Sequence, residues 1–314
     1  MRLVWFSLLA CLACPAVALA DDAAARAKLE EAFAHWDDKD PTKLLELIEE
    51  AEALEPQDPF LYNQILVSKA SVYHVKTGEL DKAEELYSTV IRNLAGVEEL
   101  PLRQIKAEAM VRKGNLIYSE RDDVKAAMQL FVAAHQTFTQ STTADVASQL
   151  SIRLAFDKST SPTKKQQLFD QALKLADEAI ASVGDQFIEG AARDQQLAKF
   201  QLQKVLVLHL SGLEDDAAAL YDTINKEHLD AEMCWYQHAL YKLLKGDFGD
   251  GTALLRQWLQ TRTTIPTRNQ ARKFIRNEPH FKDYLERVEW ADLVTDEEVK
   301  SHRPGIHLGG AKKR

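Results

Sequence analysis

The sequence is poor in glycine and proline, with 12 and 9 of them among 314 residues. Folds made of many short strands use glycine and proline at each turn, so this scarcity disfavours an all-β architecture and excludes collagen-like and low-complexity chains. Basic residues are few, 39 against 48 acidic ones, and the formal charge of −9 disfavours a nucleic-acid binder. The hydrophobic fraction of 46% is enough to build a core.

Long apolar runs are absent after the first twenty residues, MRLVWFSLLACLACPAVALA. Arg2 precedes an apolar stretch, and Ala18-Leu19-Ala20 has the small-residue pattern that signal peptidase reads, so residues 1–20 are predicted to be a signal peptide. The apolar stretch is too short to span a bilayer comfortably, and no later segment would span one. The alternatives are an uncleaved anchor or a lipoprotein acylated at Cys11 or Cys14.

Cysteine is almost absent from the mature chain. Cleavage after Ala20 removes Arg2, Cys11 and Cys14, which changes the formal charge to −10 and leaves Cys234 alone. No internal disulfide can then form, and none of the asparagines lies in a glycosylation sequence. These features favour a bacterial envelope or secreted protein, periplasmic or released after cleavage, over a eukaryotic secreted one.

Apolar residues recur along the mature chain at steps of three and four, which is typical of amphipathic helices, so an all-α fold is predicted. Polar breakers separate these segments, and a similar pattern follows several breakers: a small residue and, four positions later, a large apolar one. The pairs are Ala83/Tyr87, Ala127/Phe131, Ala217/Tyr221 and, in weaker form, Gly251/Leu255. Gly212 and Gly246, at the head of the last two, are 34 residues apart.

This pattern resembles the tetratricopeptide repeat (TPR), a helix–turn–helix unit of about 34 residues. The resemblance implies an α-solenoid in which the small residue lets the two helices of a repeat approach closely. It covers residues 21–262 as about five or six repeats, one or two of them degenerate. Residues 142–196 fit loosely, with Ala172, Ala176 and Ala179 on one helix. The alternative is an irregular helical bundle.

Residues 263–301 are predicted to form a C-terminal helical cap, because a solenoid must cover its last apolar surface. Within the cap, the spacing from Phe281 to Val288 predicts one helix, and Thr295-Asp-Glu-Glu298 predicts the start of another through a capping box. Residues 302–314 have little to bury and are predicted to be a flexible tail.

Motifs of known catalytic chemistry are missing, so no enzyme activity and no cofactor are predicted. Cys234 with His238, and His228 with Glu232, have the spacing of two residues on one helix face. No second Cys/His pair completes four metal ligands, so a metal site is not predicted. Cys234 lies beside Trp235 in an expected helix, which favours a buried, inert thiol.

The TPR resemblance also implies binding positions on the first helices of the repeats. Counting fifteen residues back from each small residue gives the partner-binding candidates Ser68, Arg112, Leu202 and Tyr236. Counting eleven back gives Val72, Leu116, Leu206 and Leu240. The asparagines of the family's carboxylate-binding members are missing at these positions. Packing between helices is the competing interpretation, and it is favoured for Leu202 because leucine gains more from burial.

The sequence therefore predicts a non-catalytic scaffold or adaptor of the bacterial envelope that binds a protein or peptide on its solenoid surface, without nucleic acid and without a membrane span. The alternatives are a permanent structural subunit of an envelope assembly and a helical enzyme or ligand-binding protein.

The predicted cleavage after Ala20 can be tested directly. Chain purified from the envelope of the producing cell is expected to begin at Asp21, as read by N-terminal sequencing or intact mass. An acylated Cys11 or Cys14 at the mature N-terminus would contradict this prediction.

Overall fold

The computed structural model describes residues 21–185 and 189–297. The predicted signal peptide, 1–20, and the predicted tail, 302–314, lie outside the described residues. The described part of the chain is helical and contains no strand, which confirms the all-α prediction. It holds no helix long and apolar enough to cross a membrane.

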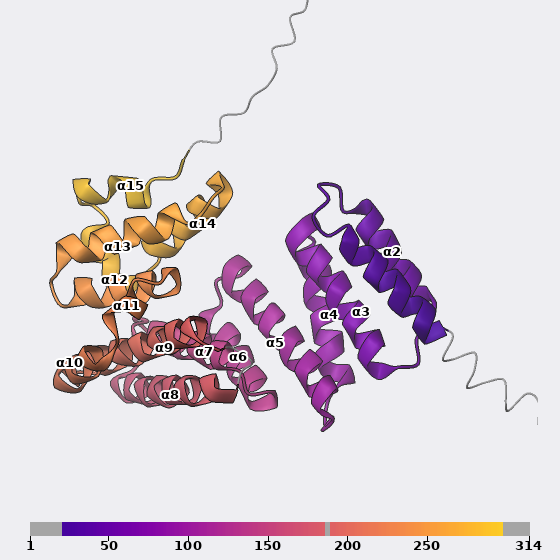
Figure 1. Cartoon of the computed structure of the whole chain (residues 1–314), viewed down its shortest axis with the longest axis horizontal. Coiled ribbons are helices and arrows are strands. Elements are labelled where there is room, and N and C mark those ends of the chain that lie inside the picture. Colours follow the sequence, from indigo (N-terminus) through magenta and orange to yellow (C-terminus); the bar gives the residue numbers. More distant parts are fainter. Residues whose placement is uncertain (1–20, 186–188, 298–314) are drawn as a thin grey trace, which may run out of the picture. The chain divides into compact units, whose positions relative to one another are not determined.

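Helices follow one another through short connections (Figure 1). The first spans residues 21–34. The next are α2 (Thr42–Ala53), α3 (Pro59–Val72), α4 (Leu80–Asn93), α5 (Leu100–Glu120), α6 (Val124–Thr137), α7 (Ser141–Ala155) and α8 (Pro162–Ala181). They are followed by α9 (Ala191–Leu210), α10 (Glu214–Thr223), α11 (Lys226–Leu229), α12 (Trp235–Leu244), α13 (Phe248–Gln260), α14 (Ile265–Arg276) and α15 (Ala291–Val294).

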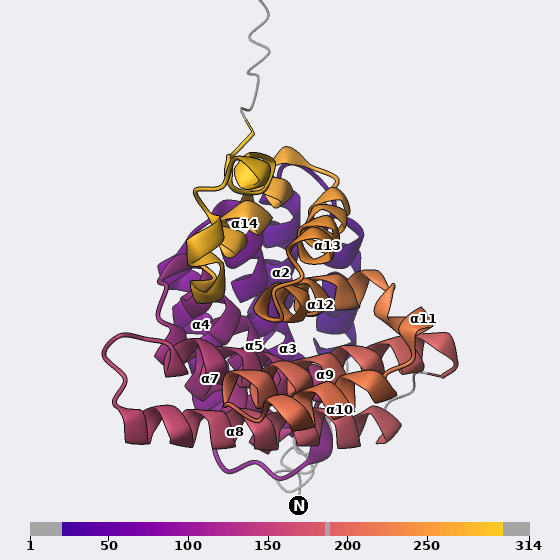
Figure 2. The same ribbon diagram turned by 90° about the vertical axis from the view of Figure 1, so that its left-hand side faces the viewer.

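The chain divides into two compact units. The first comprises Met1–Glu189 with Val207–Glu214, and the second Gly190–Leu206 with Asp215–Arg314. Within the first unit, each helix from α2 to α8 packs against the next, and α3 also packs against α5. Within the second unit, α12 packs on α13, α13 on α14 and α14 on α15. Figure 2 labels α12, α13 and α14.

Local sequence explains where the helices begin and end. Asp58 accepts a hydrogen bond from the Phe60 N–H at the start of α3, and Asp123 accepts one from Ala126 N–H at the start of α6. Such side chains satisfy amide groups that lack a partner within the helix. Gly246, before α13, has a φ of +83°, a conformation that costs glycine little. Asp122 takes the corresponding turn before α6 at a φ of +53°.

The small-and-large residue pairs predicted from sequence lie on α4, α6, α10 and α13, the second helices of their pairs. Ala83, Ala127 and Ala217 are fully buried. Their larger partners contact other helices of the same unit: the Tyr87 hydroxyl lies 3.2 Å from Ser71 Oγ on α3, and the Tyr221 hydroxyl lies 2.8 Å from His238 Nε2 on α12.

Residues 142–196 contain a further packed helix pair. α7 and α8 pack along each other, and Ala172, Ala176 and Ala179 all lie on α8 with buried side chains. Buried apolar side chains of the first unit gather between neighbouring helices. One cluster joins residues 21–34 to α2 and α3, and another joins α5 to α6.

The helix predicted from Phe281 to Val288 is wrong. The chain forms a 3₁₀ turn over Pro279–Tyr284 and a second over Val288–Trp290, and Val288 is 87% exposed. The reason is non-local, because Trp290 is fully buried with its ring centre 5.3 Å from those of Phe281 and Tyr284. A continuous helix from 281 would not leave the chain free to fold this tryptophan back onto those rings.

The helix start predicted at Thr295 is also not seen, because residues 295–297 are not helical. Glu298, the last residue of the predicted capping box, lies outside the described residues. A capping box occurs instead at the start of α14, where Thr264 and Thr267 bond to each other's backbone N–H. Glu297 N–H donates to the Asn269 side chain at 2.9 Å, so the chain after α15 is attached to α14.

Gly251 is where α13 approaches α12 most tightly. A Cβ atom there would lie 2.5 Å from Leu243 Cγ and 3.1 Å from the Ala239 carbonyl oxygen. Gly251→Ala is therefore expected to lower the free energy of unfolding by about 1–3 kcal/mol through overpacking.

Gly249→Ala is the matched control on the same helix, because a Cβ atom at Gly249 would meet nothing within 4 Å. Its effect is expected to stay within about 1 kcal/mol. Urea unfolding followed by tryptophan fluorescence, to which Trp235, Trp258 and Trp290 of the second unit contribute, measures both variants. Equal stabilities for the two would contradict the close approach at Gly251.

Candidate functional site

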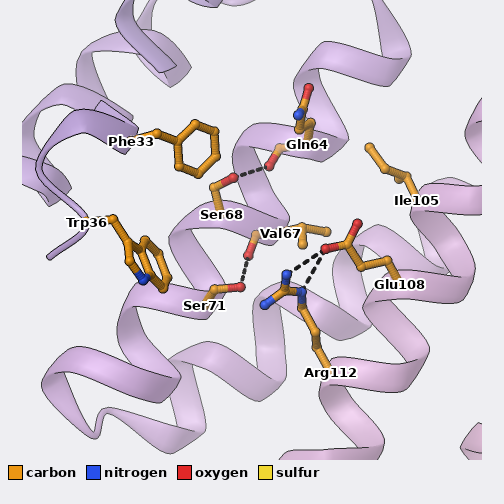
Figure 3. A pocket seen from close by; sticks show the side chains of 9 residues that line it. All are labelled: Phe33, Trp36, Gln64, Val67, Ser68, Ser71, Ile105, Glu108 and Arg112. Carbon is orange, nitrogen blue, oxygen red and sulfur yellow. Dashed lines mark hydrogen bonds and ion pairs between the residues drawn. The ribbon is translucent and has the colours of Figure 1, made fainter. Parts of the chain in front are cut away.

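A cavity of about 220 Å³ opens in the first unit between three helices that are distant in sequence. The residue 21–34 helix and the turn after it, α3 and α5 all contribute to it, and each is the first helix of a consecutive pair (Figure 3). The lining residues are Phe33, Trp36, Gln64, Val67, Ser68, Ser71, Ile105, Glu108 and Arg112.

One side of this cavity is apolar. Phe33 is 44% exposed although it is a large apolar residue, and Trp36 beside it is half-buried. Val67 on α3 and Ile105 on α5 are buried. The Lys76 ammonium lies 5.5 Å from the centre of the Trp36 ring, within the range of a cation–π contact. Exposed aromatic side chains around a hollow are typical of binding surfaces.

The other side is polar, and its groups already have partners. Arg112 donates from Nε at 2.8 Å and from Nη2 at 2.7 Å, both to Glu108 Oε1, one helical turn earlier on α5. Ser68 Oγ donates to the Gln64 carbonyl oxygen, and Ser71 Oγ donates to that of Val67, each at 2.8 Å. Figure 3 shows these four contacts within the cavity lining.

The structure brings two of the four candidate residues together. Ser68 and Arg112 both line this cavity, from α3 and α5. Leu202 on α9 is fully buried, so its side chain has no surface to offer a partner, in keeping with the packing interpretation. Tyr236 on α12 is only 9% exposed, and its hydroxyl donates to Glu278 Oε2 at 3.0 Å.

The second set of counted positions packs inside the units. Val72 and Leu116 are fully buried, and Leu206 and Leu240 are 2% and 7% exposed. Sequence reasoning missed Phe33, Trp36 and Glu108, because counting started from small residues of the second helices. One local signal was available: Glu108 and Arg112 have the i, i+4 spacing of an ion pair on a helix.

A second cavity of about 270 Å³ lies between α6 and α8 of the same unit. His135 lines it and is buried, with Nε2 3.2 Å from Glu178 Oε2 and Nδ1 3.2 Å from the Gln140 carbonyl oxygen. Lys174 extends from α8 at its edge and is 3.6 Å from Glu178. This cavity is more polar than the first and has no phenylalanine, tyrosine or tryptophan in its lining.

Cys234 is fully buried, and its Sγ lies 3.7 Å from the Gln195 carbonyl oxygen. Burial raises the pKa of its thiol to about 12, so the thiol stays protonated at neutral pH. His238 is also buried, and burial lowers its pKa. The described residues hold no group of three or more His, Cys, Asp or Glu side chains arranged to hold a metal ion.

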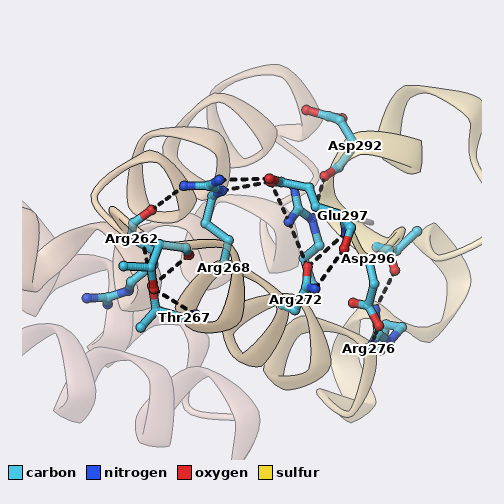
Figure 4. A network of polar contacts seen from close by, with 11 residues as sticks. Arg262, Thr267, Arg268, Arg272, Arg276, Asp292, Asp296 and Glu297 are labelled. Carbon is cyan, nitrogen blue, oxygen red and sulfur yellow. Dashed lines mark hydrogen bonds and ion pairs between the residues drawn. The ribbon is translucent and has the colours of Figure 1, made fainter. Parts of the chain in front are cut away.

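Arginines on α14 form a network with the chain after α15 (Figure 4). Arg268 makes two hydrogen bonds of 2.7 Å to the Glu297 carboxylate, and Arg272, only 7% exposed, lies 2.8 Å from it. Arg276 pairs with Asp296 at 2.8 Å. Because these guanidinium groups are paired with carboxylates of the same unit, the network holds residues 296–297 against α14 and does not form a basic binding surface.

No family model matches the chain, and a search of curated proteins finds no match. Among solved structures, the crystal structure of BtubC (BKLC) from P. vanneervenii is similar to 65% of this chain and to 88% of its own, at 19% identity and a TM-score of 0.37. A similarity of this size supports no functional inference.

The Glu297 network makes stability depend on pH in a specific direction. Hydrogen bonds from Arg268, and next from Arg272, lower the pKa of Glu297 to about 2, from an ordinary value of 4.5. A carboxyl whose pKa is lower in the folded state stabilises the fold above its unfolded pKa. That contribution is lost as the pH falls from about 4.5 to about 2.

Glu297→Gln is therefore expected to lower the melting temperature at pH 7, and the difference from wild type should shrink towards pH 2. Glu286→Gln is the control, because Glu286 is exposed and forms no ion pair with the other described residues. Thermal melts across this pH range measure the effect. A Glu297→Gln deficit that does not change with pH would contradict the assignment.

Proposed function

We propose that this chain is a non-catalytic scaffold or adaptor that binds a protein or peptide partner on a surface formed by the first helices of its helix pairs. The observation that carries the proposal is the cavity that contains Ser68 and Arg112 together with Phe33 and Trp36. It joins three successive first helices, so its apolar and polar groups converge on one hollow. The apolar groups would contact one large apolar side chain of a bound segment, and the polar groups would bond to the peptide groups of that segment.

We further propose that the helix pairs are TPR-like repeats stacked as an α-solenoid. Sequential packing supports this, since each helix of the first unit contacts its chain neighbour and α3 also contacts α5. The close approach of α13 to α12 at Gly251, and the full burial of Ala83, Ala127 and Ala217, agree with the role that the resemblance gives to small residues. In a solenoid each repeat contacts only its neighbours, so its core must consist of apolar clusters between neighbouring helices, such as those found here.

We also propose that the protein acts in the bacterial envelope, as a periplasmic or secreted protein, after cleavage following Ala20.

Two alternative functions each have an observation in their favour. Val75 and Leu100 are more than 60% exposed, which suits a permanent structural subunit covered by other chains. The His135–Glu178 pair in the second cavity suits a helical enzyme or ligand-binding protein.

Partner binding can be tested by cross-linking and pull-down from the envelope fraction with Phe33→Ala and Arg112→Glu. Truncation of a central aromatic contact typically costs about 2 kcal/mol, so Phe33→Ala is expected to weaken binding by about thirtyfold. Val288→Ala is the control, since Val288 is 87% exposed and lies outside the cavity lining.

An identical partner set at identical occupancy from the two variants and the control would remove this cavity from the binding surface. Recovery of no specific partner by the wild-type chain would contradict the scaffold proposal as a whole.

A further inference from the structure

We infer that the cavity between α3, α5 and the residue 21–34 helix takes an uncharged, internal peptide segment with one large apolar side chain, and that Glu108 sets this preference by neutralising Arg112. The inference rests on the proposed function and specifies the partner's chemistry. It concerns the polar side of the cavity, where an arginine alone would favour a carboxylate.

The pairing of Arg112 is the central observation. Its Nε and Nη2 both donate to a single oxygen of Glu108, at 2.8 and 2.7 Å, and both residues line the cavity. The two charges cancel within the site, so an incoming carboxylate would have to compete with a carboxylate already in place. A like charge beside Glu108 is unfavourable, and this repulsion acts against acidic segments and free C-termini.

Three basic side chains near the cavity, Lys69, Lys113 and His74, add no unpaired positive charge that could replace that of Arg112. Lys69 on α3 lies 2.8 Å from Glu52 and 3.3 Å from Glu49, and Lys113 on α5 lies 3.5 Å from Glu84. Burial lowers the pKa of His74, which therefore stays neutral at pH 7. Lys76 keeps its positive charge, but its ammonium lies 5.5 Å from the centre of the Trp36 ring, on the apolar side of the cavity.

The Ser68 hydroxyl adds an acceptor rather than a donor. Ser68 donates its hydrogen to the Gln64 carbonyl oxygen, so its hydroxyl offers a ligand a lone pair, whereas the Ser71 hydroxyl donates to the Val67 carbonyl oxygen and also lies 3.2 Å from the Tyr87 hydroxyl. A lone pair accepts a hydrogen bond from a peptide N–H group and repels carboxylates. The polar side therefore matches the neutral backbone of an extended segment.

The size of the cavity limits what enters it. Pockets for cofactors and drug-sized ligands measure about 300–1,000 Å³, whereas this cavity measures about 220 Å³. It accommodates a group the size of one large side chain. Phe33, Trp36 and Ile105 would contact that side chain, and the rest of the segment would extend along the three helices.

The test is a selection from a displayed library of random linear peptides, presented in separate pools with blocked and free C-termini, on the purified chain lacking residues 1–20. Wild type is expected to enrich blocked peptides that carry a large apolar residue and no adjacent Asp or Glu. The leading peptide is then resynthesised with Asp beside its apolar residue, and both versions are titrated by fluorescence anisotropy.

Glu108→Gln exposes the charge of Arg112 while its amide oxygen still accepts the guanidinium. It is expected to bind the Asp-containing peptide about tenfold more tightly than wild type does, with the neutral peptide nearly unchanged. Glu85→Gln removes the same charge from an exposed position on α4 outside the cavity, and it should leave both affinities unchanged.

Two results overturn the inference and leave the proposed function intact: enrichment of acidic or free C-terminal peptides by wild type, and equal affinities of wild type and Glu108→Gln for the Asp-containing peptide. Peptide enrichment that survives Phe33→Ala unchanged places binding elsewhere and also overturns the inference. No enrichment by wild type or by Glu108→Gln contradicts both the inference and the proposed peptide-binding function.

Discussion

The structure depends above all on how closely two consecutive helices can approach. At Gly251 there is no room for a methyl group, and at Gly114 a Cβ atom would lie 3.0 Å from the ring of Phe131 on the neighbouring helix. Close approach at a small residue allows a large residue one turn away to fill the adjacent space, as Tyr87 and Leu255 do with fully buried side chains. Each pair then keeps apolar surface on its outer sides, which the next helix in the chain covers.

That constraint is local in sequence, which explains why the sequence predicts the helix pairs well. Gly246 and Asp123 mark helix boundaries by conformation and capping, and apolar spacing identifies the buried face. Prediction fails where a distant side chain decides the backbone. Trp290 is buried against Phe281 and Tyr284, and so the segment between them turns instead of continuing as a helix.

The cavity contains residues that local sequence signals identify and residues that only the packing of distant helices brings there. Ser68 and Arg112 could be found by counting along the chain, because the interval between a pair's two helices is regular. Counting does not reach Phe33 and Trp36, because α2 has Leu44 instead of a small residue from which to count, and only the packing of three helices brings them to the same cavity as Ile105. Counting also selected Leu202 and Tyr236, whose side chains are buried. A position in a repeat fixes a helix face approximately, whereas burial depends on the neighbouring helix, which differs from pair to pair.

Charge pairing connects the candidate site to the rest of the molecule. The arginines of α14 are engaged by Glu297 and Asp296, just as Arg112 is engaged by Glu108. In a chain with more acidic than basic residues, many guanidinium groups have a carboxylate within reach. Pairing at the chain end holds a segment in place, because Arg272 is buried and would be costly to leave without a partner. Pairing at the exposed Arg112 contributes little to stability, so the role that we propose for it is to set which ligand charge the cavity accepts.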